Sequence, residues 1–163
     1  MNHHQHIASK LLSKNSLIEK LKLWNDANEK IVFTNGCFDI IHQGHIDYLA
    51  KAADLGTKLI IGVNTDASVS KLKGIHRPIQ DEKSRLLILA SFEFTDAVIL
   101  FDEETPYELI KMIQPDVLVK GSDYKAENIV GYDIVTAKGG EVKTLDFLDG
   151  FSTSAIERKI KST

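Results

Sequence analysis

Five short apolar stretches recur along this chain, and the sequence between them carries the apolar spacing and the end signals of α-helices. The stretches cover residues 31–33, 59–63, 97–101, 117–119 and 142–145. Several are apolar at nearly every position, as strands are when both faces of a parallel sheet are covered. Strands that alternate with helices predict an α/β fold. We expect a Rossmann-like, doubly wound parallel sheet of about five strands with flanking helices.

Helix ends and chain length suggest one domain behind a short tail. Ser16 with Glu19 and Thr105 with Glu108 are spaced as capping boxes at two helix starts. Residues 1–15, which include three histidines between positions 3 and 6, are predicted to be a flexible N-terminal tail rather than a metal site. Residues 16–163 are predicted to form a single domain, because one core commonly serves about 100–200 residues.

Composition excludes several classes of function. The formal net charge is −3, so the chain has no general attraction for nucleic acid or anionic membranes, and we expect neither as a partner. No apolar run approaches the roughly 20 residues of a membrane span. The single cysteine excludes an internal disulfide and fits a reducing, cytoplasmic location. Any phosphate ligand must therefore be held by a local site.

The first candidate for such a site follows the first apolar stretch, where ligands of open α/β sheets bind. Gly36 permits a sharp turn close to a ligand. His42 and His45 flank Gly44 where a helix should begin, and a helix N-terminus presents free N–H groups to anions. Two imidazoles there could donate hydrogen bonds to phosphate oxygens. The same pair could also be surface residues or half of a metal site.

The second candidate lies near the other end of the chain. Gly150 and Phe151 precede three hydroxyl residues that should open the last helix: Ser152, Thr153 and Ser154. Hydroxyl and free N–H groups at a helix start favour an anion, although they could equally serve as a simple cap. Seen together with the histidine pair, the hydroxyl cluster favours a second phosphate contact.

These two motifs resemble those of a known superfamily of nucleotidyltransferases. The His-x-Gly-His pattern at 42–45 and the stretch at 150–158 are similar to motifs of the superfamily that includes cytidylyltransferases and pantetheine-phosphate adenylyltransferase, with Phe151 and Ser154 as departures. Residues 32–39, 62–69, 72–78, 115–124 and 139–142 further resemble the adenylyltransferases that make ADP-heptose from D-glycero-β-D-manno-heptose 1-phosphate. This similarity covers about residues 16–160, and Ser122 replaces a more usual glycine.

The resemblance implies an enzyme that transfers AMP from ATP to a sugar 1-phosphate and releases pyrophosphate, for the supply of lipopolysaccharide core heptose. It implies Mg²⁺ that arrives with ATP, no metal site made by the protein alone, a homodimer, and a separate sugar kinase acting upstream. No general base is needed, because a phosphate monoester is largely dianionic at pH 7. Catalysis would then be positioning and charge stabilisation.

Residue roles follow from the resemblance and from the two motifs. The catalytic residues are predicted to be His42, His45 and Lys73. Nucleotide and phosphate binding is assigned to Thr34, Asn35, Gly36, Phe38, Gly44, Lys71, Gly121, Asp123, Ser152, Thr153 and Ser154. Sugar-phosphate binding is assigned to Asn35, Asp39, Asn64 and Arg77. Other interpretations stay open for some of these residues.

Those open interpretations are structural. Lys71 and Lys73 could be solvated loop lysines, and Asp39 could brace its loop instead of touching a ligand. Arg85 is a weaker candidate for phosphate binding that could simply pair with Asp81 at helical spacing. Lys120 is placed to reach phosphate. Cys37 is read as packing.

Three alternative functions remain. A cytidylyltransferase acting on glycerol phosphate or a similar alcohol phosphate would share fold and mechanism, but that group usually carries an arginine near the position of Phe147. A tRNA-synthetase fragment would need a distant lysine-rich loop and a much longer chain, and the acidic balance of this chain disfavours RNA. A nucleotide-binding protein without activity is disfavoured by the presence of both motifs.

Overall fold

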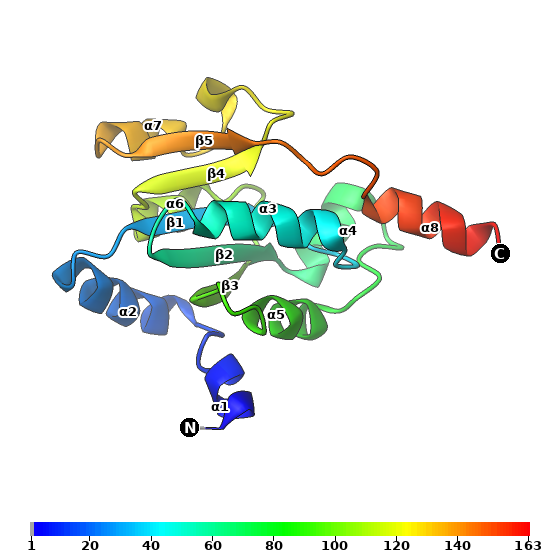
Figure 1. Ribbon diagram of the computed structural model, residues 1–163, viewed down its shortest axis with the longest axis horizontal. Coiled ribbons are helices and arrows are strands. Elements are labelled where there is room, and N and C mark those ends of the chain that lie inside the picture. The colour runs from blue at the N-terminus through cyan, green and yellow to red at the C-terminus, as the bar shows by residue number, and fades with distance from the viewer. Residues whose placement is uncertain (1) are drawn as a thin grey trace.

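A single parallel sheet of five strands forms the centre of the protein, which is described here over residues 2–163 by a computed structural model (Figure 1). The strands are β1 (Ile31–Gly36), β2 (Lys58–Asn64), β3 (Ala97–Phe101), β4 (Val117–Gly121) and β5 (Glu141–Leu145). They lie in the order β3-β2-β1-β4-β5, and every neighbouring pair is parallel. The predicted α/β, doubly wound fold is confirmed.

Helices cover both faces of this sheet. One face packs against α2 (Lys14–Asp26), α6 (Tyr107–Ile113) and α7 (Tyr132–Ala137), and its core includes Phe33 and Ile60. The other face packs against α3 (Gln43–Ala53) and α5 (Glu82–Ala90), with Val32 and Ile61 in its core. Successive residues of β1 and β2 therefore alternate between two apolar cores, which explains why these strands are apolar throughout.

Two helices lie at the end of the sheet where the strands finish. Helix α4 (Asp66–Lys73) follows β2 directly, and α8 (Thr153–Lys161) extends beyond the sheet at the C-terminal end of the chain (Figure 1). The chain runs outward from β1 to β3 on one side and then returns to add β4 and β5 on the other. This reversal places the topological switch point between β1 and β4, where a ligand cleft is expected.

The N-terminal segment differs from the predicted tail. Residues His3–Ala8 form α1, and Leu11 makes a parallel bridge with Val98 on the free edge of β3. The Lys10 ammonium donates a hydrogen bond to the Phe92 carbonyl at 3.0 Å. The three histidines of this segment are exposed. That residues 16–163 form one domain stays a prediction.

Both predicted capping boxes are wrong in position. Helix α2 begins earlier, because Ser13 rather than Ser16 is its N-cap and accepts a hydrogen bond from the Ser16 N–H at 3.2 Å. Helix α6 begins after Pro106, and no side chain of the described residues caps it. Over residues 2–163 no helix combines the length and the apolar character needed to cross a bilayer.

Candidate active site

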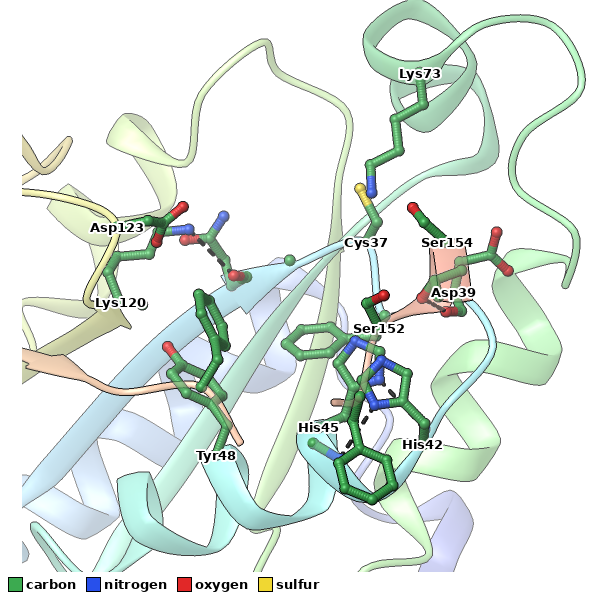
Figure 2. Close-up of a pocket in the computed structure, with 18 of the residues that line it drawn as sticks. Cys37, Asp39, His42, His45, Tyr48, Lys73, Lys120, Asp123, Ser152 and Ser154 are labelled. Carbon is green, nitrogen blue, oxygen red and sulfur yellow. Dashed lines mark hydrogen bonds between the residues drawn. The ribbon is translucent and has the colours of Figure 1, made fainter. Parts of the chain in front are cut away.

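A cavity of about 540 Å³ opens at the carboxyl ends of the strands, at the switch point (Figure 2). The β1–α3 loop, α3, β4 and the start of α8 all contribute to its wall. The described residues that line it are Asn35, Gly36, Cys37, Phe38, Asp39, His42, Gly44, His45, Tyr48, Lys73, Lys120, Gly121, Asp123, Tyr124, Phe147, Phe151, Ser152, Thr153 and Ser154. Both predicted phosphate motifs thus face one common space.

The histidine pair is oriented by the backbone at the start of α3. His42 is the N-cap, and its Nδ1 accepts a hydrogen bond from the Gly44 N–H at 3.1 Å. The Nδ1 of His45 accepts one from the His42 N–H at 3.4 Å. The two rings stack with their centroids 3.9 Å apart. Because each Nδ1 is an acceptor, the proton of each neutral ring sits on Nε2, which remains a donor.

The environment keeps this pair uncharged. Burial is the largest of the causes that lower the pKa of His45 to about 4; the neighbouring His42 and Lys73 act in the same direction, while Asp39 opposes them. Burial also lowers the pKa of His42. At neutral pH the pair therefore offers phosphate oxygens two neutral N–H donors.

The start of α8 supplies the second group of donors. Ser152 is the N-cap, and its hydroxyl accepts a hydrogen bond from the Ala155 N–H at 3.1 Å. The Thr153 hydroxyl donates to the Asp39 carbonyl at 2.9 Å and so ties α8 to the β1–α3 loop. The first N–H groups of a helix have no acceptor within it, which leaves those of Thr153 and Ser154 available to an anion.

Gly44 allows the two helix starts to approach each other. A Cβ added to Gly44 would lie 3.2 Å from the Cβ of Phe151 and 3.0 Å from Cε1 of His42. A larger residue at this position would push the imidazole or the segment before α8 out of place. Close packing therefore favours glycine at this position of the His-x-Gly-His motif.

Asp39 serves as a brace for the site. Its carboxylate accepts hydrogen bonds from Nε of Arg77 and the Ile79 N–H, both at 2.8 Å, and from the Gln80 N–H at 3.0 Å. Burial acts to raise the pKa of Asp39, but the hydrogen bonds from Gln80, Ile79 and Arg77 outweigh it and lower the pKa. Nη1 of Arg77 also pairs with Glu157 of α8 at 3.3 Å. Asp39 and Arg77 thus connect three segments of the wall.

Two lysines bring positive charge to the cavity from different elements. Lys73 ends α4, and its side chain extends toward Cys37 in Figure 2. Lys120 lies on β4, where its ammonium donates a hydrogen bond to the Asn35 carbonyl at 3.2 Å. Burial lowers the pKa of Lys120, while Cys37 and Asp123 oppose that shift.

Four predicted ligands are not among the described residues that line the cavity: Thr34, Asn64, Lys71 and Arg77. The Thr34 hydroxyl points into the protein, where it bonds to the Tyr48 hydroxyl at 2.8 Å and the Val119 carbonyl at 3.0 Å. The Asn64 amide donates to Ser68 at 2.9 Å. Lys71 is exposed on α4. The roles assigned to these four residues stay predictions, and in the structure their side chains support the wall or face solvent.

Aromatic residues of the wall were missed in the sequence. The rings of Phe147 and Tyr48 lie with their centroids 5.9 Å apart, and the Phe147 ring occupies the space that a side chain on Gly121 would need. Burial raises the pKa of Tyr48 to about 12, although the Thr34 hydrogen bond opposes this, so the phenol stays protonated. The sequence feature that could have indicated this aromatic wall is the presence of two phenylalanines, at 147 and 151, in the loop after the last strand.

Arg85 connects the loops beneath the cavity instead of reaching phosphate. Its side chain is fully buried. The guanidinium donates to the Cys37 carbonyl at 2.6 Å, to the Gln80 carbonyl at 3.1 Å and to the Asp66 carboxylate at 2.8 Å. The predicted pairing with Asp81 is wrong, because Asp81 caps α5.

The described residues also include polar atoms that a ligand could use. Oδ1 of Asn35 is buried and has no hydrogen-bond partner within residues 2–163. Asp123 places an exposed carboxylate on the cavity wall. No group of three or more histidine, cysteine, aspartate or glutamate side chains in the described part of the chain is arranged to hold a metal ion. One carboxylate together with phosphate oxygens is a typical Mg²⁺ environment.

Comparisons with known proteins agree with this geometry. A model of the cytidylyltransferase-like family matches residues 33–159. Bifunctional protein HldE of Wolinella succinogenes is 50% identical over 162 residues, which are 99% of this chain and 33% of that protein. Its counterpart in Campylobacter jejuni subsp. doylei is 55% identical over 152 residues, 93% of this chain and 32% of that protein. The chain thus spans about a third of the length of the curated relatives that it matches.

Two solved structures share the fold. The lipopolysaccharide core biosynthesis protein from Thermoplasma volcanium superimposes with a TM-score of 0.60 at 31% identity, over 74% of this chain and 97% of that one. Pantoate-beta-alanine ligase from Francisella tularensis gives a TM-score of 0.55 at 16% identity, over 88% of this chain and 75% of that one. At 16% identity, the similarity to the ligase concerns the fold alone.

Proposed function

This chain belongs to the cytidylyltransferase-like family, and from that premise we propose that it transfers AMP from ATP to a sugar 1-phosphate and releases pyrophosphate. The acceptor that we propose is D-glycero-β-D-manno-heptose 1-phosphate, as a step in lipopolysaccharide core synthesis. The observation that carries the proposal is the meeting of two helix N-termini at one cavity. One bears the neutral histidine pair and the other bears the hydroxyl cluster.

The reaction needs few chemical groups from the protein. A phosphate oxygen of the acceptor attacks the α-phosphorus of ATP, a new O–P bond forms, and the bond to the β-phosphate oxygen breaks. The pair of electrons of that bond leaves with pyrophosphate. Since the acceptor phosphate is largely dianionic at pH 7, no side chain has to remove a proton.

The chain's own residues would bind the charge that develops. Nε2–H of His42 and of His45 donate to phosphate oxygens, and the free N–H groups at the start of α8 do the same from the opposite side. Lys73 and Lys120 add positive charge at two other positions on the wall. Mg²⁺ bound to the triphosphate would neutralise part of its charge, and Asp123 is the carboxylate of the wall placed to contribute a ligand.

The aromatic residues that line one part of the cavity favour ATP as the nucleotide. Phe147 lies at the place where cytidylyltransferases usually carry an arginine, and its ring forms an apolar wall with Tyr48 beside Gly121. An aromatic wall suits stacking with a nucleotide base. The alternative, CTP with glycerol phosphate or a similar alcohol phosphate, would lack the arginine that cytidylyltransferases usually carry there.

The rest of the biochemical setting is proposed on the same basis. A sugar 1-phosphate must be made by an earlier phosphoryl-transfer step, so we propose a separate sugar kinase upstream. We also propose a homodimer and, because ATP is the donor, a cytoplasmic location.

The deciding experiment measures pyrophosphate release from ATP, CTP and GTP with heptose 1-phosphate and with glycerol 3-phosphate. We expect turnover with ATP and heptose 1-phosphate that is well above that of every other pair. A preference for CTP would overturn the assignment of the base. Absence of turnover with both acceptors and across a wider panel of sugar 1-phosphates, while ATP still binds, would overturn the enzyme assignment.

A further inference from the structure

A second, smaller cavity adjoins the first. It measures about 200 Å³ and lies between the loop after β3 and the segment after β4. Lys120 and Tyr124 line both cavities, so these two residues form a shared wall. Glu104, Thr105 and Asn128 supply the polar part of the smaller cavity, while Pro106 and Ile129 supply an apolar part.

Size and charge indicate what this second cavity can accept. Pockets for drug-sized ligands measure about 300–1,000 Å³, a range that includes the first cavity but not the second. The smaller space therefore suits one ring rather than a nucleoside with its phosphates. The carboxylate of Glu104 would repel a triphosphate, whereas it would accept hydrogen bonds from hydroxyl groups.

The polar groups of this cavity are free to bind a ligand. Among residues 2–163, no hydrogen bond or ion pair of the protein engages the side chains of Glu104, Thr105 or Asn128. The Lys120 ammonium donates to the Asn35 carbonyl, and an ammonium has three N–H donors. Two donors of Lys120 are thus left for a group placed at the shared wall.

We propose that the second cavity binds the sugar ring of the acceptor and that Lys120 binds the acceptor phosphate at the boundary between the cavities. The inference rests on the proposed function and assigns the acceptor to a place. Glu104, Thr105 and Asn128 contact ring hydroxyls, and the phosphate of the acceptor faces the α-phosphate of a nucleotide in the first cavity. Glu104 and Asn128 are then residues that determine acceptor specificity.

The test uses two substitutions in the smaller cavity, Glu104→Ala and Asn128→Ala. A matched control is Glu127→Ala, which removes an exposed glutamate adjacent to Asn128 that does not line either cavity. Equilibrium binding is measured by calorimetry with heptose 1-phosphate and, separately, with the non-cleavable analogue α,β-methylene-ATP. Steady-state KM values for acceptor and ATP are measured in parallel.

We expect each cavity variant to raise the Kd and the KM for heptose 1-phosphate about tenfold, as the loss of a hydrogen bond to a buried polar ligand does. The Kd for the ATP analogue should stay within twofold, and Glu127→Ala should match the wild type. Weaker binding of the ATP analogue, or unchanged acceptor binding, would overturn the inference and leave the proposed function standing.

Other outcomes separate the inference from the function. If the wild type binds heptose 1-phosphate, loses it in the variants, and never releases pyrophosphate, the cavity assignment stands and the proposed reaction fails. If the wild type binds ATP but no sugar phosphate, both fail.

Discussion

Each imidazole of the histidine pair turns Nδ1 toward the backbone, and this orientation defines what the residues can do. Nε2–H becomes the group that meets phosphate, so a replacement that keeps a donor at that position should keep part of the function. A glutamine amide reaches about as far as Nε2, and an asparagine amide about as far as Nδ1. The structure therefore distinguishes two polar substitutions that resemble each other chemically.

His42→Ala and His45→Ala are each expected to lower kcat by on the order of 10²–10³, the usual cost of losing a transition-state donor. For His45, glutamine should restore more of kcat than asparagine does. Pyrophosphate release under saturating substrates measures kcat for the alanine, glutamine and asparagine variants. A variant that turns over at a near-normal rate would remove that histidine from the mechanism.

His42→Ala should also lower the free energy of unfolding by about 1 kcal/mol, because His42 is the N-cap of α3.

The depressed pKa of His45 predicts a dependence of stability on pH. Folding lowers this pKa from 6.5 to about 4, so between these values the unfolded chain binds more protons than the folded one. Stability should therefore rise with pH across this window and be lost as pH falls toward 4. Urea unfolding at pH 7 and at about pH 4.5 tests this, and His45→Gln should show a shallower dependence than the wild type. If the free energy of unfolding changed equally with pH in the two proteins, the prediction would be contradicted.

The sequence indicated where the two motifs lie better than it indicated how single side chains point. The helix starts at His42 and Ser152 could be placed because such starts are marked in the sequence by their residues. The inward direction of the Thr34 and Asn64 side chains could not be predicted, because it depends on neighbours that are distant in sequence.

Among the elements, α8 contributes one of the two helix starts of the site while being held by few contacts. Within α8, all of which the structure describes, no residue is buried. Its attachments include the Thr153–Asp39 hydrogen bond and the ion pair between Glu157 and Arg77. An element held in this way can separate from the sheet without unfolding the core.

Glu157→Gln is therefore expected to weaken the position of α8 rather than the fold. We expect kcat/KM for ATP to fall about two- to fivefold, in line with a partly exposed ion pair, with the melting temperature nearly unchanged. Hydrogen exchange should become faster in residues 152–161 alone. Lys159→Gln, on the same helix, serves as the control. A large fall in melting temperature with unchanged activity would show that α8 supports the core instead.

All five strands could be located from sequence, although β1 and β4 extend beyond the predicted stretches, whereas the starts of α1, α2 and α6 could not. Residues 59–63 and 97–101 were identified because strands covered on both faces have a continuous apolar signature. The start of α2 was placed three residues late, since several serines could cap it and only the folded geometry selects Ser13. Helix α1 was missed because none of its residues is buried.

For the whole molecule, Arg85 holds together the carboxyl-end loops on which the cavity depends. One guanidinium bonds to Cys37 in the connection between β1 and β2, and to Asp66 and Gln80 at two places in the connection between β2 and β3. Nothing in the sequence indicates these partners, because they are brought together only by the strand order. The sequence predicted the parallel sheet, but not which loops meet above it.

Arg85→Met should destabilise the protein by about 3 kcal/mol, because it removes a fully buried guanidinium and leaves the half-buried Cys37 and Gln80 carbonyls and the Asp66 carboxylate without their partner. Chemical denaturation measures this loss, and Lys83→Met on the exposed side of the same helix is the comparison. Activity measured well below the melting temperature should also fall, because the Cys37 carbonyl lies in the loop that lines the cavity. A stability equal to that of Lys83→Met would contradict this role.

The pairing of residues 10–12 along β3 has a consequence at high protein concentration. The Val98 N–H donates to the Lys10 carbonyl at 2.8 Å, and the Leu12 N–H donates to the Val98 carbonyl at 3.0 Å, so this edge has few groups left to recruit another strand. The opposite edge, β5, carries Glu141 and Lys143, whose charges discourage contact with a second sheet. Both borders of the sheet thus carry features that disfavour edge-to-edge aggregation, and we expect copies of the chain to associate through their helices and loops.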